Sequence, residues 1–155
     1  MKQTLNFLLI LVMVATVFSC KKSDPELTPA QKIVGKYKIT ANTTTINNVV
    51  ENNLTDEPAC YTDNVWEFTT DFKTIISEGA TSCPTPSQTQ TVSYVLASDG
   101  KTLTFTGTNG MGNTFSEIYI VPELTSAVLK ISRTDTYVDL GVTTTAKNDV
   151  TLTKI

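Results

Sequence analysis

The side chains that could perform chemistry in this chain are carboxylates and cysteines, because the sequence contains no histidine. Histidine is the commonest general base, the commonest metal ligand and the side chain that titrates near neutral pH. Serine is plentiful, but there is no Gly-x-Ser-x-Gly motif and no histidine to activate a serine. We therefore predict no catalytic residue, no metal site and no cofactor.

Three glutamates fall in segments that we predict to be strands, and a pair of them could act as the acid and base of a glycoside hydrolase. They are Glu67, Glu78 and Glu117. Alternation along a strand places such residues on an outward face or on the polar side of a barrel, so we interpret them as structural charge. A hydrolase with paired carboxylates is the third of three functional hypotheses.

A second acidic group lies close to Cys60 and consists of Asp56, Glu57 and Asp63. Calcium binds carboxylate oxygens of this kind. The sequence lacks an Asp-x-Asp-x-Asp-Gly loop, and we interpret the group as a solvated acidic loop. The chain has a net charge of −3 and no basic patch, so we do not expect nucleic acid as a partner.

Residues 1–19 have the pattern of an export signal. Lys2 is followed by an apolar run over residues 7–18 that is too short to span a bilayer. The run ends in Val17-Phe18-Ser19-Cys20, which resembles the lipobox of bacterial lipoproteins, with a departure at Phe18. The resemblance implies cleavage before Cys20 and acylation of its thiol and new amino group. The alternative is an ordinary signal peptide in which Cys20 has no role.

Residues 20–30 are polar and contain two prolines, and we interpret them as a lipidated cysteine and its tether. Ten extended residues reach at most ~35 Å, so the domain would stay close to the membrane. Lys21, rather than the aspartate that retains some lipoproteins at the inner membrane, follows Cys20. We therefore expect the outer membrane, with the domain facing the periplasm or the cell surface. Thr28 and Pro29 predict one helical turn that ends at Ile33.

Residues 31–155 predict a single all-β domain. Threonine, whose branched Cβ favours extended backbone, occurs 29 times, and long runs of helix-forming residues are absent. Alternating apolar residues predict strands at 34–41, 64–69, 74–78, 89–97, 102–106, 113–121, 127–133, 136–140 and 149–155. Loops are expected at 79–88, 107–112 and 141–148, and a long loop with a little strand or helix in it is expected at 42–53. Pro122 is expected to end a strand. This spacing predicts an antiparallel up-and-down β-barrel of about eight strands.

Two cysteines remain if Cys20 carries lipid. Cys60 and Cys83 flank a predicted hairpin, so their positions come close together in any register. The compartment beyond the inner membrane is oxidising, and we therefore predict a disulfide between them. A redox or metal pair is the alternative, but the sequence offers no Cys-x-x-Cys motif.

Several stretches resemble the small lipocalin-like domains of bacterial envelope lipoproteins. They are Gly35-Lys36-Tyr37-Lys38-Ile39, Asp63-Asn64-Val65-Trp66-Glu67-Phe68, Glu78-Gly79, Ser98-Asp99-Gly100-Lys101-Thr102-Leu103 and Val150-Thr151-Leu152-Thr153-Lys154. The likeness spans residues 34–155 and departs at one turn, where Asp71-Phe72 replaces the usual Asp-Gly. It implies a lipocalin-like meander, and it implies no activity, because members of this family mostly have none assigned.

Aromatic side chains are expected to line the barrel interior. The five that we place there are Trp66, Phe68, Tyr94, Phe105 and Tyr119. An eight-stranded barrel is either filled by its own side chains or holds one small ligand, and we expect a filled or shallow interior. The first hypothesis is a non-enzymatic, lipid-anchored protein that binds a small apolar or glycan-like ligand. The second is a structural or accessory lipoprotein that docks a protein partner in the outer membrane.

Overall fold

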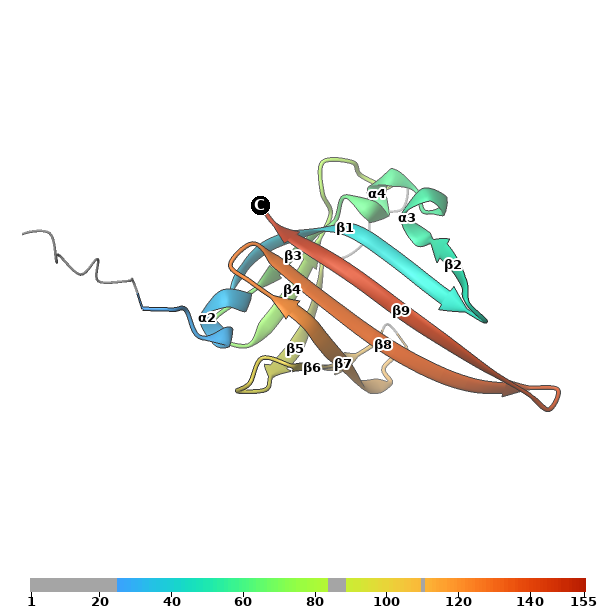
Figure 1. Ribbon diagram of the computed structural model, residues 1–155. Helices are drawn as coiled ribbons and strands as arrows, with labels where there is room; N and C mark the ends of the chain where they lie inside the picture. The colour runs from blue at the N-terminus through green and yellow to red at the C-terminus, as the bar shows by residue number, and fades with distance from the viewer. Residues whose placement is uncertain (1–24, 84–88, 110) are drawn as a thin grey trace, which may run out of the picture.

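The structure, a computed structural model, describes residues 25–83, 89–109 and 111–155 and forms one closed β-barrel (Figure 1). Each strand of the barrel pairs antiparallel with the next, and β9 returns to pair with β1. The strands are β1 (Gly35–Ile46), β2 (Val49–Asn52), β3 (Val65–Phe68), β4 (Lys73–Ser77), β5 (Gln90–Leu96), β6 (Thr102–Thr108), β7 (Thr114–Leu124), β8 (Val128–Asp139) and β9 (Val142–Lys154). The predicted up-and-down barrel of about eight strands is confirmed, with β2 as an additional strand beside β1.

The two ends of the barrel differ. One end carries α2 (Pro29–Ile33) and the β3–β4, β5–β6 and β7–β8 turns. The other end, here called the mouth, carries the β1–β2, β6–β7 and β8–β9 turns together with α3 (Asn53–Asp56) and α4 (Ala59–Thr62). Figure 1 shows α2 and the long β8–β9 hairpin at opposite ends of the molecule. In an up-and-down barrel, successive connections lie at alternate ends. The strand order therefore determines which turns lie at the mouth.

Helix α2 closes the end opposite the mouth. Thr28 accepts a hydrogen bond from the Gln31 backbone N–H, and the Gln31 side chain accepts one from the Thr28 N–H, so the helix begins with a capping box. Pro29 occupies the first turn, where its missing N–H has no helical partner to lose. Ile33 is fully buried against the barrel core. The predicted helical turn through Ile33 is confirmed.

The core fills the α2 half of the barrel around Phe68. The Phe68 ring centre lies 5.6 Å from that of Tyr37, 5.3 Å from that of Tyr94 and 6.2 Å from that of Phe105. The pairs with Tyr37 and Tyr94 are edge-to-face, an arrangement that suits the quadrupoles of aromatic rings. Tyr94 donates its hydroxyl to the Thr69 carbonyl at 2.8 Å, which keeps its polar atom bonded. This half of the interior is therefore solid.

Residues 42–53, predicted as a long loop with a little strand or helix in it, are instead mostly strand, because β1 continues to Ile46 and forms a hairpin with β2. The turn consists of Asn47 and Asn48, whose φ angles are 50° and 66°. Asparagine tolerates this left-handed region better than other non-glycine residues, and two such residues match the twist of a tight hairpin. An Asn-Asn pair is a weaker signal than Asn-Gly, so the pattern of polar residues suggested a loop.

The predicted polar link over residues 141–148 is also wrong. Strands β8 and β9 are paired continuously up to Asp139 and Val142, and only Leu140 and Gly141 form the turn, with φ angles of 47° and 82°. The two segments predicted at 127–133 and 136–140 are one strand, β8. The sequence here is rich in threonine and shows little apolar alternation. Hydrogen bonds between β8 and β9 stabilise both strands instead.

Pro122 does not end its strand, contrary to our prediction. Strand β7 continues to Leu124, and its register with β8 shifts between Ile120 and Glu123. A proline has no N–H for the ladder, and a bulge is one of the places in a sheet where it is tolerated. The glycine-rich loop predicted at 107–112 is shorter than expected, since β6 reaches Thr108.

Candidate functional site

The mouth half of the barrel contains a cavity of about 290 Å³. Its lining comes from eight strands, β1 and β3 to β9, and is mostly aliphatic and aromatic. The lining residues are Ile39, Asn42, Trp66, Ile76, Gln90, Val92, Phe105, Phe115, Glu117, Tyr119, Ile131, Val150 and Leu152. Small-molecule sites typically have such a mainly apolar lining with a few polar groups that orient the ligand.

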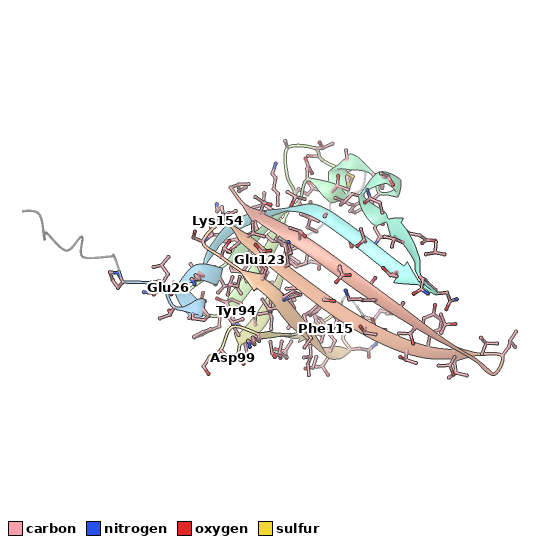
Figure 2. All side chains as sticks on the ribbon, viewed as in Figure 1. Glu26, Tyr94, Asp99, Phe115, Glu123 and Lys154 are labelled. Carbon is pink, nitrogen blue, oxygen red and sulfur yellow. A yellow bond between two sulfur atoms is a disulfide. The ribbon has the colours of Figure 1, made fainter. Side chains whose placement is uncertain are left out.

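Strand β7 supplies three lining residues through its period of two. Phe115, Glu117 and Tyr119 line the cavity, whereas Ile118 and Ile120 are exposed on the outer face. In Figure 2, Phe115 lies farther along the barrel from α2 than Tyr94, which packs in the core. Strand β7 therefore carries apolar residues on both of its faces.

A bulge in β1 brings Asn42 to the cavity. Ile39 is paired with Leu152, but Ala41 is paired with Thr151, so the register slips by one residue between them. Asn42 is paired with Val150, and both line the cavity. Strict alternation along β1 would place Ala41 on the same face as Ile39, but an extra residue in one strand moves the following side chains to the other face.

The five aromatic residues predicted to face the interior all do so, at two depths. Trp66, Phe105 and Tyr119 line the cavity. Phe68 and Tyr94 lie in the solid core of the α2 half. Phe105 contacts both groups, since its ring centre is 5.6 Å from that of Tyr119 and 6.2 Å from that of Phe68. The expected filled interior thus describes the α2 half, and the mouth half is hollow.

An ionic group stands at the cavity between β7 and β8. Arg133 Nη1 lies 2.7 Å from Glu117 Oε1, and Arg133 Nε lies 2.9 Å from Asp135 Oδ2. Tyr119 donates its hydroxyl to Glu117 Oε2 at 2.9 Å, and the Arg133 guanidinium lies 5.5 Å from the centre of the Tyr119 ring. The hydrogen bond that Arg133 donates to Glu117 raises the pKa of Arg133 above its usual range, so the guanidinium stays charged. Burial, followed by the bond to Glu117, raises the pKa of Tyr119 to about 12, so its hydroxyl remains a donor.

A chain of neutral polar groups holds α3 against β1 beside the cavity. Asn53 of α3 donates from Nδ2 to Asn42 Oδ1 at 3.1 Å and to Thr44 Oγ1 at 2.9 Å. Thr44 in turn donates to Asn148 Oδ1 at 2.7 Å across the β1–β9 pair. The Asn42 Nδ2 group has no protein acceptor within the described residues, and it remains a donor for a ligand.

The predicted disulfide between Cys60 and Cys83 is confirmed. It joins α4 to the segment that follows β4, and both cysteines are buried. Asp63 reinforces this link, because its Oδ2 accepts the Thr81 backbone N–H at 2.8 Å, and that bond lowers the pKa of the Asp63 carboxyl. Gly79 fits against the Asp63 backbone, where a Cβ would collide with the carbonyl oxygen. The mouth-side segments are therefore fastened to the barrel.

The acidic residues that could have formed a catalytic pair are separated. Glu117 lines the cavity, but Glu67 forms an ion pair with Lys36 at 3.7 Å on the outer surface. Glu78 lies beyond the end of β4 and is not among the lining residues. No group of histidine, cysteine, aspartate and glutamate side chains within residues 25–83, 89–109 and 111–155 is arranged to hold a metal ion. The expected roles of Cys20 and of residues 1–19 fall outside the described residues.

A second hollow, of about 430 Å³, lies outside the barrel beside α2. Its lining mixes Lys32, Asp99 and Lys101 with prolines and aliphatic residues. This composition is that of an ordinary surface groove, whereas the inner cavity combines an apolar wall with a few convergent polar groups. We therefore take the inner cavity as the candidate site.

Three polar or aromatic lining residues were not foreseen as a ligand site: Asn42, Gln90 and Phe115. Asn42 depends on a bulge, for which the sequence gives no signal. Gln90 is the first residue of β5 and follows a segment that the sequence predicts as a loop, so its face could not be assigned. Phe115 alternates with Glu117 and Tyr119, and that period of two was the one available signal.

The fold and the cavity define a small up-and-down β-barrel that is solid at one end and hollow at the other. Neither family models, nor curated proteins, nor solved structures match this chain. The likeness to lipocalin-like lipoprotein domains therefore stays a prediction. No helix of the described segments is long and apolar enough to cross a bilayer.

Proposed function

We propose that this protein is a non-enzymatic, lipid-anchored envelope protein whose barrel binds a small, mainly apolar ligand. The observation that carries the proposal is the cavity of about 290 Å³ with Trp66, Phe105 and Tyr119 in its wall. Its volume is close to the lower end, about 300 Å³, of the range typical of small-molecule sites. The ligand is accordingly the size of two or three rings or a short alkyl chain.

An apolar ligand fits this lining better than a glycan. Ile39, Ile76, Val92, Ile131 and Val150 surround the aromatic rings. A glycan would leave most of its hydroxyl groups without partners against these side chains, and each unsatisfied buried group is costly. The polar groups of Asn42, Gln90 and Glu117 suffice to orient a single head group.

A lipid on Cys20 would hold the barrel by its solid end. The described chain enters at Pro25 and leads directly into α2, opposite the mouth (Figure 1). The mouth would then point away from the outer membrane that carries the anchor. A tether of residues 20–30 leaves the mouth accessible to solutes of the periplasm or of the cell surface.

The test uses the fluorescence of Trp66, the single tryptophan of the chain, which lies in the cavity wall. We expect the neutral apolar dye N-phenyl-1-naphthylamine to bind and to quench Trp66 by energy transfer. Val92→Phe, which adds bulk inside the cavity, should reduce dye affinity by about tenfold or more, in line with the cost of overfilling a packed site.

Val95→Phe is the matched control, because Val95 lies on the same strand and is exposed on the outer face. It should leave dye affinity as in the wild type. If both variants lose dye affinity equally, or if Val92→Phe loses none, the dye binds elsewhere and the interior site is contradicted.

A second candidate function, the docking of a protein partner, is favoured by the outer face of β5–β7. Val95, Ile118 and Ile120 are 63%, 59% and 58% exposed there. Val95 of β5 and Ile118 of β7 are both register partners of Thr104, so they lie at the same level on the two strands that flank β6. A photo-reactive amino acid at position 118 should then cross-link one defined envelope protein, while the same group at exposed Thr134 of β8 should not. Equal cross-linking from both positions would count against this role.

A further inference from the structure

The charged side chains of the barrel are distributed unevenly along its axis. Carboxylates predominate among the described residues of the mouth half, where they outnumber cationic groups by about two to one. The acidic residues are Glu51, Glu57, Asp63, Glu78, Glu117, Asp135 and Asp149, and the cationic ones are Lys38, Arg133 and Lys147. Most lysines lie in the α2 half: Lys32, Lys36, Lys73, Lys101, Lys130 and Lys154. A cation approaching the mouth is therefore attracted and an anion repelled.

The cavity wall itself has the composition of a cation site. Among the described lining residues, four have aromatic rings, Trp66, Phe105, Phe115 and Tyr119, and Glu117 is the one that is charged. The face of an aromatic ring attracts a cation, and cages of several rings are a recognised way to bind ammonium groups. A carboxylate among the rings adds full charge to this attraction.

Glu117 can accept a further donor although it already has two partners. Its Oε1 faces Arg133 Nη1 at 2.7 Å, and its Oε2 accepts the Tyr119 hydroxyl at 2.9 Å. Each carboxylate oxygen has two acceptor positions, so one remains on each oxygen. Arg133 is shared with Asp135, and the three side chains together carry one net negative charge.

We propose that the ligand of this cavity is a cationic amphiphile, a small apolar molecule that carries a protonated or quaternary ammonium group. The ammonium group lies among the aromatic rings beside Glu117. The apolar remainder packs against Ile39, Ile76 and Val92. This inference rests on the proposed ligand-binding function and specifies the charge of the ligand.

The experiment compares three probes with alkyl chains of seven or eight carbons and different head groups: octyltrimethylammonium, 1-octanol and octanoate. Each is titrated as a monomer into the full chain by calorimetry at neutral pH and low salt. We expect octyltrimethylammonium to bind at least about tenfold more tightly than octanoate, with octanol between them, since the Coulomb energy changes sign while the apolar contact stays constant.

Glu117→Gln keeps the size of the side chain and removes its charge. This substitution should lower the affinity for octyltrimethylammonium by about tenfold and leave the affinity for octanol nearly unchanged. Asp149→Asn is the matched control, because Asp149 is a carboxylate of the mouth half that pairs with Lys147 at 2.7 Å and does not line the cavity. It should alter none of the three affinities by more than about twofold, the effect of a screened surface charge.

The outcomes separate this inference from the function on which it rests. If octanoate or octanol binds as tightly as octyltrimethylammonium, the cavity binds apolar ligands but the inference about charge is overturned. Another outcome is that the ammonium probe binds most tightly while Glu117→Gln and Asp149→Asn lower its affinity equally. In that case the preference arises from the electrostatic field of the whole mouth half and not from a site at Glu117, and the inference is overturned. If none of the three probes binds, both the inference and the proposed function fail.

Discussion

Lys154 of β9 donates from its Nζ atom to the carbonyl oxygen of Val34 at a distance of 2.7 Å. The same ammonium group donates to the Lys32 carbonyl at 3.1 Å and lies 5.3 Å from the centre of the Tyr37 ring. The last carbonyls of a helix have no partner within the helix, so a cation at this end is favourable. The end of the last strand therefore fastens α2 and the start of β1, and it completes the solid half of the barrel.

Replacing Lys154 with methionine should lower the free energy of unfolding by about 2 kcal/mol, because a partly buried charged donor is lost and the Val34 carbonyl loses its hydrogen bond from Lys154. Urea unfolding followed by Trp66 fluorescence measures the change. Lys130→Met is the control, since Lys130 forms an exposed ion pair with Glu123 at 2.7 Å and such pairs contribute at most about 1 kcal/mol. Equal losses in the two variants would show that Lys154 has no special role.

Removing the disulfide should lower the free energy of unfolding by about 3 kcal/mol, the chain-entropy value for a closed loop of this length. The sequence separation of Cys60 and Cys83 is 23 residues. Cys60→Ser tests this by urea unfolding, and thiol titration in denaturant should find one thiol more than in the wild type. Two additional reactive thiols in the unreduced wild type would mean that the bond does not form in the native protein.

The stability of the barrel should fall at high pH because of its buried tyrosines. Burial raises the pKa of Tyr37 from its ordinary value of 10.0 to about 12. The neutral hydroxyl donates to the Lys32 carbonyl at 3.0 Å, so the folded state holds a proton that the unfolded chain releases above pH 10. The free energy of unfolding is then level below pH 10 and declines between pH 10 and about 12.

Unfolding in urea at a series of pH values measures this decline. Tyr37→Phe should be less stable at neutral pH, through the lost hydrogen bond, yet its stability should fall less steeply in the alkaline window. Tyr61→Phe is the control, at an exposed position on α4. An alkaline slope that is the same in wild type and Tyr37→Phe would mean that the decline has another source.

Membrane attachment should depend on Cys20. Cys20→Ala removes the thiol that the lipobox resemblance assigns to acylation, so the protein should leave the membrane fraction and become soluble in the exported compartment. A single acyl chain binds only marginally, but two or more chains hold stably, and the difference between the variants should be nearly complete. Lys21→Ala, next to Cys20, is the control and should stay with the membrane. Continued membrane association of Cys20→Ala would contradict the lipobox interpretation.

The regular part of the fold could be predicted from the sequence because each strand buries alternate apolar residues. Trp66 and Phe68, and likewise Leu103 and Phe105, occur two residues apart, and both pairs face the interior. Short, strongly alternating strands were placed to within a few residues. The disulfide followed from the position of the cysteines on either side of one hairpin.

The parts of the fold that were not predicted depend on interactions between segments, which the pattern of a single segment does not reveal. Strands β8 and β9 extend far beyond the apolar core, where backbone hydrogen bonds between two polar segments define the structure. The bulge after Ile39 turns Asn42 rather than Ala41 inward. Phe72 adopts a φ of 62° in a turn where glycine is usual, and its ring packs on Tyr94 at 5.9 Å. The size of the cavity reflects how all these side chains meet, so it could not be predicted from spacing alone.

Gly107 creates part of the room for Phe115 in the cavity wall. A Cβ at position 107 would lie 3.0 Å from the Phe115 ring and 3.1 Å from Val92 Cγ1, so both lining side chains would have to move. Gly107→Ala should lower the free energy of unfolding by about 1 kcal/mol and weaken binding of N-phenyl-1-naphthylamine several-fold. Overpacking is costly here because the strand backbone cannot move away from the new methyl group.

A double-mutant cycle shows whether the contact with Phe115 is the cause of both effects. Phe115→Leu removes the ring edge that the new methyl group would meet, so it should be less destabilising with Gly107→Ala present than in the wild type, by about 0.5 kcal/mol or more. Strict additivity would mean that the two positions are independent. In that case Gly107 would act through the sheet backbone, and the shape of the cavity would not depend on its missing side chain.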